Sequence, residues 1–188
     1  MLATMGRVIH SMSVSLDSFV ETTGRSLDWV QVDEELHSFF NDEAREASAF
    51  LYGRRMYELM TDYWPTGESD PSATPAMVEF ARIWKDKPKI VFSRTLDSVD
   101  WNSRLVHDDP AEEVARLKAQ PGFDMSVGGP TLASTLMRHG LIDEFRADAL
   151  DADRGSHSIG GIRSREDAHA QPTHQRRGGT QLRRGVGA

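Results

Sequence analysis

The chain has 188 residues, a formal net charge of −7 at neutral pH and 38% hydrophobic residues, which fits one globular domain with a sizeable core. It contains no cysteine, which excludes disulfides and thiolate metal sites, and it has no apolar run long enough to cross a bilayer. The acidic body argues against nucleic acid as a partner, and we expect a cytoplasmic protein with no membrane partner and no metal site.

The first predicted strand lies at residues 7–17, a β-leaning run that ends before a turn at 22–24. A helix is predicted from about Asp33, with apolar residues at helical spacing: Leu36, Phe39, Phe40 and Ala44. Its first turn carries Asp33, Glu34 and Glu35. Such acids usually stabilise the positive end of the helix dipole, and the alternative is that one of them faces a cleft.

The middle of the chain alternates strands and helices. A short buried strand at 49–52 ends at Gly53, where two arginines open a helix, and a proline-rich loop at 65–75 leads to a helix from 76 to about 84. The next strand, 89–92, ends in Ser93, Arg94 and Thr95. We expect a short edge strand at 105–106 and a helix at 110–118, whose acids precede its basic residues.

Residues 125–145 contain the most informative junction. A buried strand ends at Gly128 and Gly129, and Pro130 and Thr131 open a helix that stops at Gly140. Two glycines allow close backbone approach, and a helix start offers free N–H groups to an anion. The alternative interpretation is an ordinary tight turn with proline at the first helical position.

This order of elements predicts an α/β domain with three layers, in which helices cover both faces of a mostly parallel sheet. In such sheets ligands bind beyond the carboxyl ends of the strands. The Gly53, Ser93 and Gly128 junctions all belong to that rim. Three junctions suited to anions on one rim favour a dinucleotide site over three unrelated turns.

From Arg7 to about Phe145 the chain resembles the dihydrofolate-reductase-like superfamily. The closest resemblance is to the reductase domain of bifunctional riboflavin-biosynthesis deaminase-reductases. The matching segments are Ser-Leu-Asp-Ser at 15–18, Leu-Asp-Trp at 27–29, Tyr-Gly-Arg-Arg-Met-Tyr-Glu at 52–58, Tyr-Trp-Pro at 63–65, Val-Phe-Ser-Arg-Thr-Leu at 91–96, Val-Gly-Gly-Pro at 127–130 and Gly-Leu-Ile-Asp-Glu at 140–144. The family usually has glycine where Ser18 stands.

The resemblance implies NADPH lying across the strand ends. Gly53 and Arg54, with Arg55 beside them, would receive the pyrophosphate, and Ser93, Arg94 and Thr95 would hold the adenosine 2′-phosphate. A third group would pass beneath the nicotinamide and pyrophosphate: Gly128, Gly129, Pro130 and Thr131. The resemblance also implies a cis peptide bond between the two glycines of the third group. Hydride transfer fits such a rigid cradle, because the protein's part is orientation and charge.

The carboxylate that supports protonation is predicted by position. Folate-reducing relatives place it five residues after the tryptophan, which lands on Glu34 when counted from Trp29, with Asp33 next to it. In a partly apolar cleft near Phe39, such a carboxylate could act as an acid or anchor a heterocycle amide. Asp17 is the other candidate.

The tail departs from the family. We assign residues 1–150 to the NADPH-binding domain and 151–188 to a tail, because 147–154 shows no strand pattern and 151–188 lacks aromatic residues and lysine. Such a composition predicts disorder. One hypothesis is a shifted reading frame, which would leave the sheet without its last strands, and the rival is a natural basic arm. The histidines of the tail are too irregularly spaced for a metal site.

Two functions from different classes follow from these features. The first is an NADPH-dependent reductase of a pterin, an aminopyrimidine of riboflavin-precursor type or a related flat heterocycle. The second is a catalytically silent nucleotide-binding or scaffolding member of the fold. The resemblance also implies a homodimer formed through the late strands.

Overall fold

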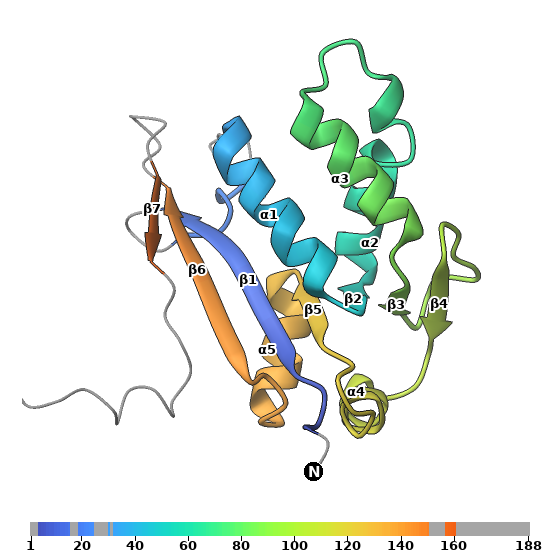
Figure 1. Ribbon diagram of the computed structural model, residues 1–188. Coiled ribbons are helices and arrows are strands. Elements are labelled where there is room, and N and C mark those ends of the chain that lie inside the picture. Colours follow the sequence, from blue (N-terminus) through green and yellow to red (C-terminus); the bar gives the residue numbers. More distant parts are fainter. Residues whose placement is uncertain (1–3, 16–18, 25–29, 31, 151–156, 161–188) are drawn as a thin grey trace, which may run out of the picture.

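A mostly parallel sheet forms the centre of the molecule. The computed structural model describes residues 4–15, 19–24, 30, 32–150 and 157–160. Within them the strand order is β4-β3-β2-β5-β1-β6-β7 (Figure 1). The strands are β1 (Val8–Ser15), β2 (Ala49–Gly53), β3 (Lys89–Phe92), β4 (Ser103–Val106), β5 (Met125–Gly128), β6 (Glu144–Leu150) and β7 (His157–Gly160). All neighbouring pairs are parallel except β6 and β7.

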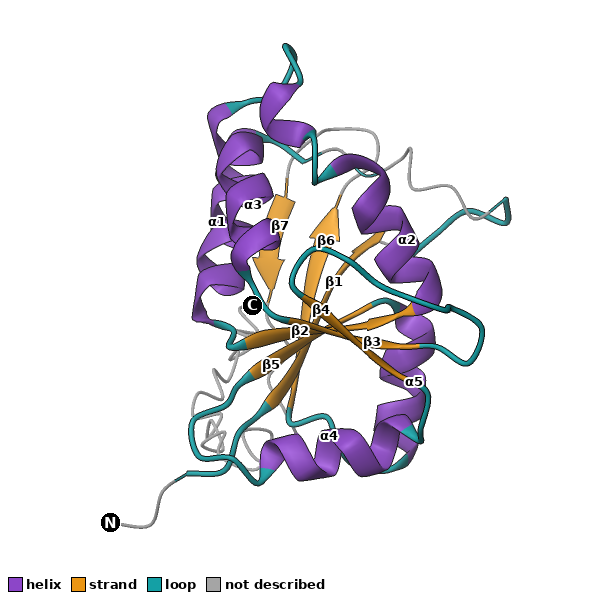
Figure 2. Ribbon diagram, turned by 90° about the vertical axis from the view of Figure 1, so that its right-hand side faces the viewer, coloured by secondary structure: helices purple, strands orange, loops and turns teal. Residues whose placement is uncertain are grey.

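Helices cover both faces of this sheet (Figure 2). They are α1 (Glu34–Glu46), α2 (Arg54–Tyr63), α3 (Pro75–Asp86), α4 (Pro110–Lys118) and α5 (Pro130–Arg138), with a short 3-10 turn η1 (Gly67–Ser69) before α3. The predicted three-layer α/β fold is confirmed, with β1 in the interior of the sheet and β4 at its edge.

Side-chain alternation along the strands divides the core into two clusters. On β2, Ala49 and Leu51 pack with α4 and α5, whereas Phe50 and Tyr52 pack with α1, α2 and α3. All four residues are buried, as expected for a parallel strand covered on both faces. The helices are therefore held in place by the period-2 pattern of the strands between them.

The helix starts are of two chemical kinds. Side chains of Asp33, Thr74 and Asp109 cap α1, α3 and α4, and proline occupies the first turn of α3 and α4. In contrast, α2 and α5 begin at Gly53 and Gly129, and no side chain accepts a hydrogen bond from their first N–H groups. Two helix starts are thus left with donors available to another acceptor.

The strand β6 corrects the sequence analysis, which found no strand pattern at 147–154. Seven residues, Glu144–Leu150, pair in parallel with Ile9–Ser15 of β1. Alanine and charged residues disfavour strands in isolation, but strand preference depends strongly on the neighbouring strand. Here β1 supplies a continuous row of backbone partners, which decides the conformation.

The strand β7 adds a second correction. It pairs antiparallel with β6, with His157 opposite Leu150 and Gly160 opposite Ala147. The prediction of disorder was therefore wrong for these four residues of the tail, and β6 is not an unpaired edge. Residues 151–156 and 161–188, on which the remaining predictions for the tail depend, lie outside the described residues.

Candidate functional site

The centre of the candidate site is the point where chain connections switch from one face of the sheet to the other. β2 and β5 are neighbours, with Tyr52 opposite Gly128. From their carboxyl ends α2 departs to the face of Tyr57 and Trp84, whereas α5 departs to the face of Leu132 and Leu136. Ligands of open α/β sheets bind in the crevice that such a switch creates. The two uncapped helix starts flank this crevice.

The two glycines at the end of β5 are required by their surroundings. A Cβ atom on Gly128 would lie 2.8 Å from Cε1 of Tyr52, a side chain that is only 4% exposed. Gly129 has φ 86° and ψ 136°, and a Cβ atom there would lie 3.3 Å from Cβ of Met56. Only glycine fits both positions, because Tyr52 and Met56 occupy the space that a Cβ atom would need.

The predicted cis bond between Gly128 and Gly129 is wrong. The described residues contain no cis peptide bond. The chain turns from β5 into α5 through the positive φ of Gly129 instead. Pro130 and Thr131 follow as exposed residues of the first turn of α5.

The end of β3 forms a tight turn that carries an arginine unpaired among the described residues, Arg94. The Ser93 hydroxyl accepts hydrogen bonds from the backbone N–H groups of Thr95 and Leu96, both at 3.1 Å. Arg54 donates to the Thr95 hydroxyl at 2.8 Å and to Glu58 at 2.6 Å, which links this turn to the start of α2. Arg94 is exposed and makes no hydrogen bond or ion pair with any described residue. Its guanidinium is available for an anion.

His107 joins this turn and was missed in the sequence analysis. It follows the last residue of β4, and its Nδ1 donates to the Ser93 carbonyl oxygen at 2.7 Å. The only available signal was its place directly after a predicted strand, beside the strand that ends at Ser93. That proximity depends on the pairing of β3 with β4.

Arg55, the second arginine of the Gly53 junction, is paired. Its guanidinium lies 2.9 Å from Glu21, a residue of the segment that follows β1. This ion pair connects that segment to the start of α2. Arg54 is paired as well, with Glu58, so Arg94 is the arginine of these junctions whose guanidinium has no partner among the described residues.

The predicted acids lie in an unexpected environment. Asp33 caps α1 by accepting a hydrogen bond from the Leu36 N–H at 2.9 Å. Glu34 is exposed, and its side chain has no partner among the described residues. Asp17 and Trp29 lie outside the described residues. Of the three acids, Glu34 is the one shown with a free carboxylate.

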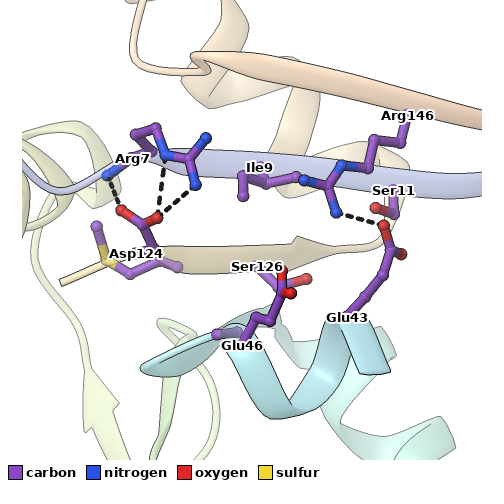
Figure 3. A pocket seen from close by; sticks show the side chains of 10 residues that line it. Arg7, Ile9, Ser11, Glu43, Glu46, Asp124, Ser126 and Arg146 are labelled. Carbon is purple, nitrogen blue, oxygen red and sulfur yellow. Dashed lines mark hydrogen bonds and ion pairs between the residues drawn. The ribbon is translucent and has the colours of Figure 1, made fainter. Parts of the chain in front are cut away.

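A polar pocket lies at the opposite, amino edge of the sheet, between α1 and the strands β1, β5 and β6 (Figure 3). Arg7 binds Asp124 through its backbone N–H at 2.8 Å and its guanidinium at 2.6 Å. Arg146 donates to Glu144 at 2.8 Å and also to Glu43, and these hydrogen bonds raise the pKa of Arg146. The pairs tie α1 and β6 to the sheet, which indicates a structural role for the pocket.

In the part of the chain that the structure describes, no helix is long and apolar enough to cross a membrane. The same residues contain no group of three or more histidines or acids placed to hold a metal ion.

Comparison with known proteins decides the family. The model of the RibD C-terminal domain matches residues 7–148. The chain belongs to the RibD C-terminal domain family. Over 141 residues it is 36% identical to the uncharacterized protein YyaP of Bacillus subtilis (strain 168), covering 74% of this chain and 72% of YyaP.

Two solved structures share the fold of this RibD C-terminal domain. A solved structure named Putative riboflavin biosynthesis protein, from Shewanella sp. PV-4, aligns with a TM-score of 0.56 and 19% identity, covering 84% of this chain and 85% of that one. Dihydrofolate reductase from Enterococcus faecalis, complexed with NADP(H) and RAB-propyl, aligns with a TM-score of 0.51 and 14% identity, covering 86% and 78%. The dihydrofolate-reductase-like fold that the resemblance implied is thereby confirmed.

Proposed function

We propose that this protein is an NADPH-dependent reductase that transfers a hydride to a flat heterocycle, such as a pterin or an aminopyrimidine. The observation that carries the proposal is the pair of uncapped helix starts at Gly53 and Gly129, on neighbouring strands at the switch point of the sheet. A dinucleotide pyrophosphate fits there, because two sets of free N–H groups and two positive dipole ends meet at one crevice.

The residues around the crevice fit NADPH. Gly128 and Gly129 place bare main chain at this junction, packed against Tyr52 and Met56 where a Cβ atom would lie, so no side chain of their own hinders a flat ring. At the end of β3, the free guanidinium of Arg94 lies in a turn ordered by Ser93, and His107 adds a second group suited to binding phosphate. These groups favour a dinucleotide with a 2′-phosphate over one without it.

When bound, NADPH would supply the hydride, and the chain's own residues would orient it and manage charge. Gly128 and Gly129 would fix the position of the nicotinamide against the substrate. Glu34, whose carboxylate has no partner among the described residues, is the proposed proton source. The names of the family and of the Shewanella relative support a riboflavin-precursor-like aminopyrimidine as the first substrate to test.

The test is a titration of the full chain with NADPH and NADH, followed by tryptophan fluorescence and melting temperature. We expect saturable binding that prefers NADPH. Arg94→Ala should weaken NADPH binding by about 10- to 100-fold, because one charge-assisted contact is lost, and should change NADH binding little. Arg138→Ala is the matched control, since Arg138 is an exposed arginine in the last turn of α5.

Two results would contradict the proposal. A folded wild-type protein that does not bind NADPH would exclude the cofactor, and equal loss in both arginine variants would exclude the 2′-phosphate role of Arg94. The second candidate, a silent nucleotide-binding protein, is favoured by the exposure of Glu34. It predicts NADPH binding without oxidation of NADPH in the presence of any heterocycle, and an unchanged affinity in Glu34→Gln.

A further inference from the structure

The boundary between the neighbouring strands β1 and β5, called the seam below, is hydrogen-bonded only along its first part. Its ladder contains Val8 opposite Met125 and Ile9 opposite Ser126, and it stops there. On the outer sides both strands stay paired, β5 with β2 as far as Gly128 and β1 with β6 as far as Ser15. The opening is therefore confined to this one seam, and it lies beside the end of β5 at Gly128 and Gly129.

One backbone oxygen marks where the seam parts. Continuing the parallel ladder by one step would place His10 opposite Val127, with the Ser11 N–H donating to the Val127 carbonyl oxygen. The register ends one residue earlier. Instead, Nδ1 of His10 lies 2.9 Å from this oxygen. A side chain has taken the place of the ladder hydrogen bond.

The surroundings of His10 hold its ring in this position. The residue is 4% exposed, and its ring meets the Phe145 ring edge-on, with centroids 6.2 Å apart. Phe145 lies directly opposite His10 on β6. Because a carbonyl oxygen can only accept, Nδ1 must carry the proton, which fixes the tautomer of a neutral ring.

We propose that His10 is a positioning residue that keeps the ends of β1 and β5 apart. By binding the Val127 carbonyl, its imidazole prevents Ser11 from closing the seam beside Gly128. The opened seam then admits the edge of a planar ring, the nicotinamide or the heterocycle that it reduces. This inference rests on the proposed function for the identity of the ring, but the seam itself can be measured without a ligand.

A purely structural role makes different predictions. If His10 only filled the core, a side chain of similar size without a hydrogen-bond donor would serve equally well. Leucine and methionine are such side chains, whereas glutamine keeps an N–H donor. Phe145→Leu is the matched control, because it removes the ring contact on β6 and leaves the hydrogen bond between His10 and Val127.

The experiment compares the full-length wild type with His10→Leu, His10→Met, His10→Gln and Phe145→Leu. Amide hydrogen exchange at Ser11 is measured by NMR without ligand, and NADPH affinity by fluorescence. In the wild type, the Ser11 amide should exchange much faster than that of Ile9, which lies in the paired part of the ladder. His10→Leu and His10→Met should slow Ser11 exchange and weaken NADPH binding, each by about tenfold. For His10→Gln and Phe145→Leu, the Ser11 exchange rate and the NADPH affinity should both stay within about threefold of the wild type.

The outcomes separate the two proposals. Slow exchange of Ser11 in the wild type, or unchanged exchange in the folded apolar variants, would overturn the role of His10. If Ser11 exchange slows in the apolar variants but their NADPH affinity is unchanged, the opened seam does not admit the ring. A wild type that binds no NADPH would refute the proposed function and the ring's identity, while the exchange rates would still decide whether His10 holds the seam open.

Discussion

A glycine-to-alanine series gives the sharpest test of the crevice. Three glycines near α5 differ in what an added methyl group would meet. Gly140 has φ 65° with no atom within 4 Å of a new Cβ, so it probes the backbone alone. Gly128 probes contact, because the new atom would lie 2.8 Å from the Tyr52 ring. Gly129 probes both, with φ 86° and a contact of 3.3 Å to Met56.

The expected losses of unfolding free energy follow from these geometries. Gly140→Ala should cost about 1–2 kcal/mol, the usual penalty of a left-handed backbone for alanine. Gly128→Ala should cost about 1–3 kcal/mol, because the buried Tyr52 ring must move. Gly129→Ala should cost about 2–4 kcal/mol, since its backbone strain is larger and a contact is added. For a chain of this size, 3 kcal/mol corresponds to a fall in melting temperature of roughly 9 °C.

The assay combines urea denaturation with NADPH titration of each folded variant. Gly128→Ala and Gly129→Ala should weaken NADPH binding, because the methyl group displaces Tyr52 or Met56 beside the crevice, whereas Gly140→Ala should leave it unchanged. Equal unfolding free energies of Gly129→Ala and Gly140→Ala would refute the added cost of the Met56 contact. NADPH binding like that of the wild type in all three variants would refute the place of Gly128 and Gly129 at the cofactor site.

Two further predictions concern stability away from the crevice. Asp33→Ala should lower the unfolding free energy by about 1 kcal/mol in urea denaturation, because the Leu36 N–H loses its cap, whereas Asp33→Asn, which can still cap, should lose much less. Burial lowers the pKa of Lys89 from 10.5 to about 8, although its ammonium donates to the carbonyl oxygens of Trp84 and Lys87. Between these pH values the unfolded chain holds the proton and the folded one does not, so stability should rise with pH, by up to about 3 kcal/mol relative to Lys89→Met. If the unfolding free energies of the wild type and Lys89→Met changed with pH in parallel, the lowered pKa of Lys89 would be contradicted.

Local chemistry made most of the elements predictable. Asp33 before an apolar helical pattern, and Pro110 after Asp109, mark helix starts by cap and first-turn preferences that act within a few residues. The Gly128 and Gly129 pair marked the end of a strand in the same way. The position of these junctions on one rim followed from the alternation of strands and helices, since parallel strands end at the same edge.

The strand β6 shows where local chemistry fails. Its alanines and charged residues gave no strand signal, and pairing with β1 along seven residues decided its conformation. The exposure of Glu34 was equally out of reach, because the side of a helix that faces solvent near its start depends on how it packs. The count from Trp29 identified a carboxylate but not its surroundings.

Interactions between neighbours along the chain were enough to predict the alternation of strands and helices and the glycine junctions. Tertiary structure alone decided which strands are adjacent, and with them the features that adjacency creates. His107 reaches Ser93 because β3 pairs with β4, and His10 reaches the Val127 carbonyl because β1 and β5 are neighbours in the sheet. Residues this distant in the chain become neighbours only when the sheet is assembled.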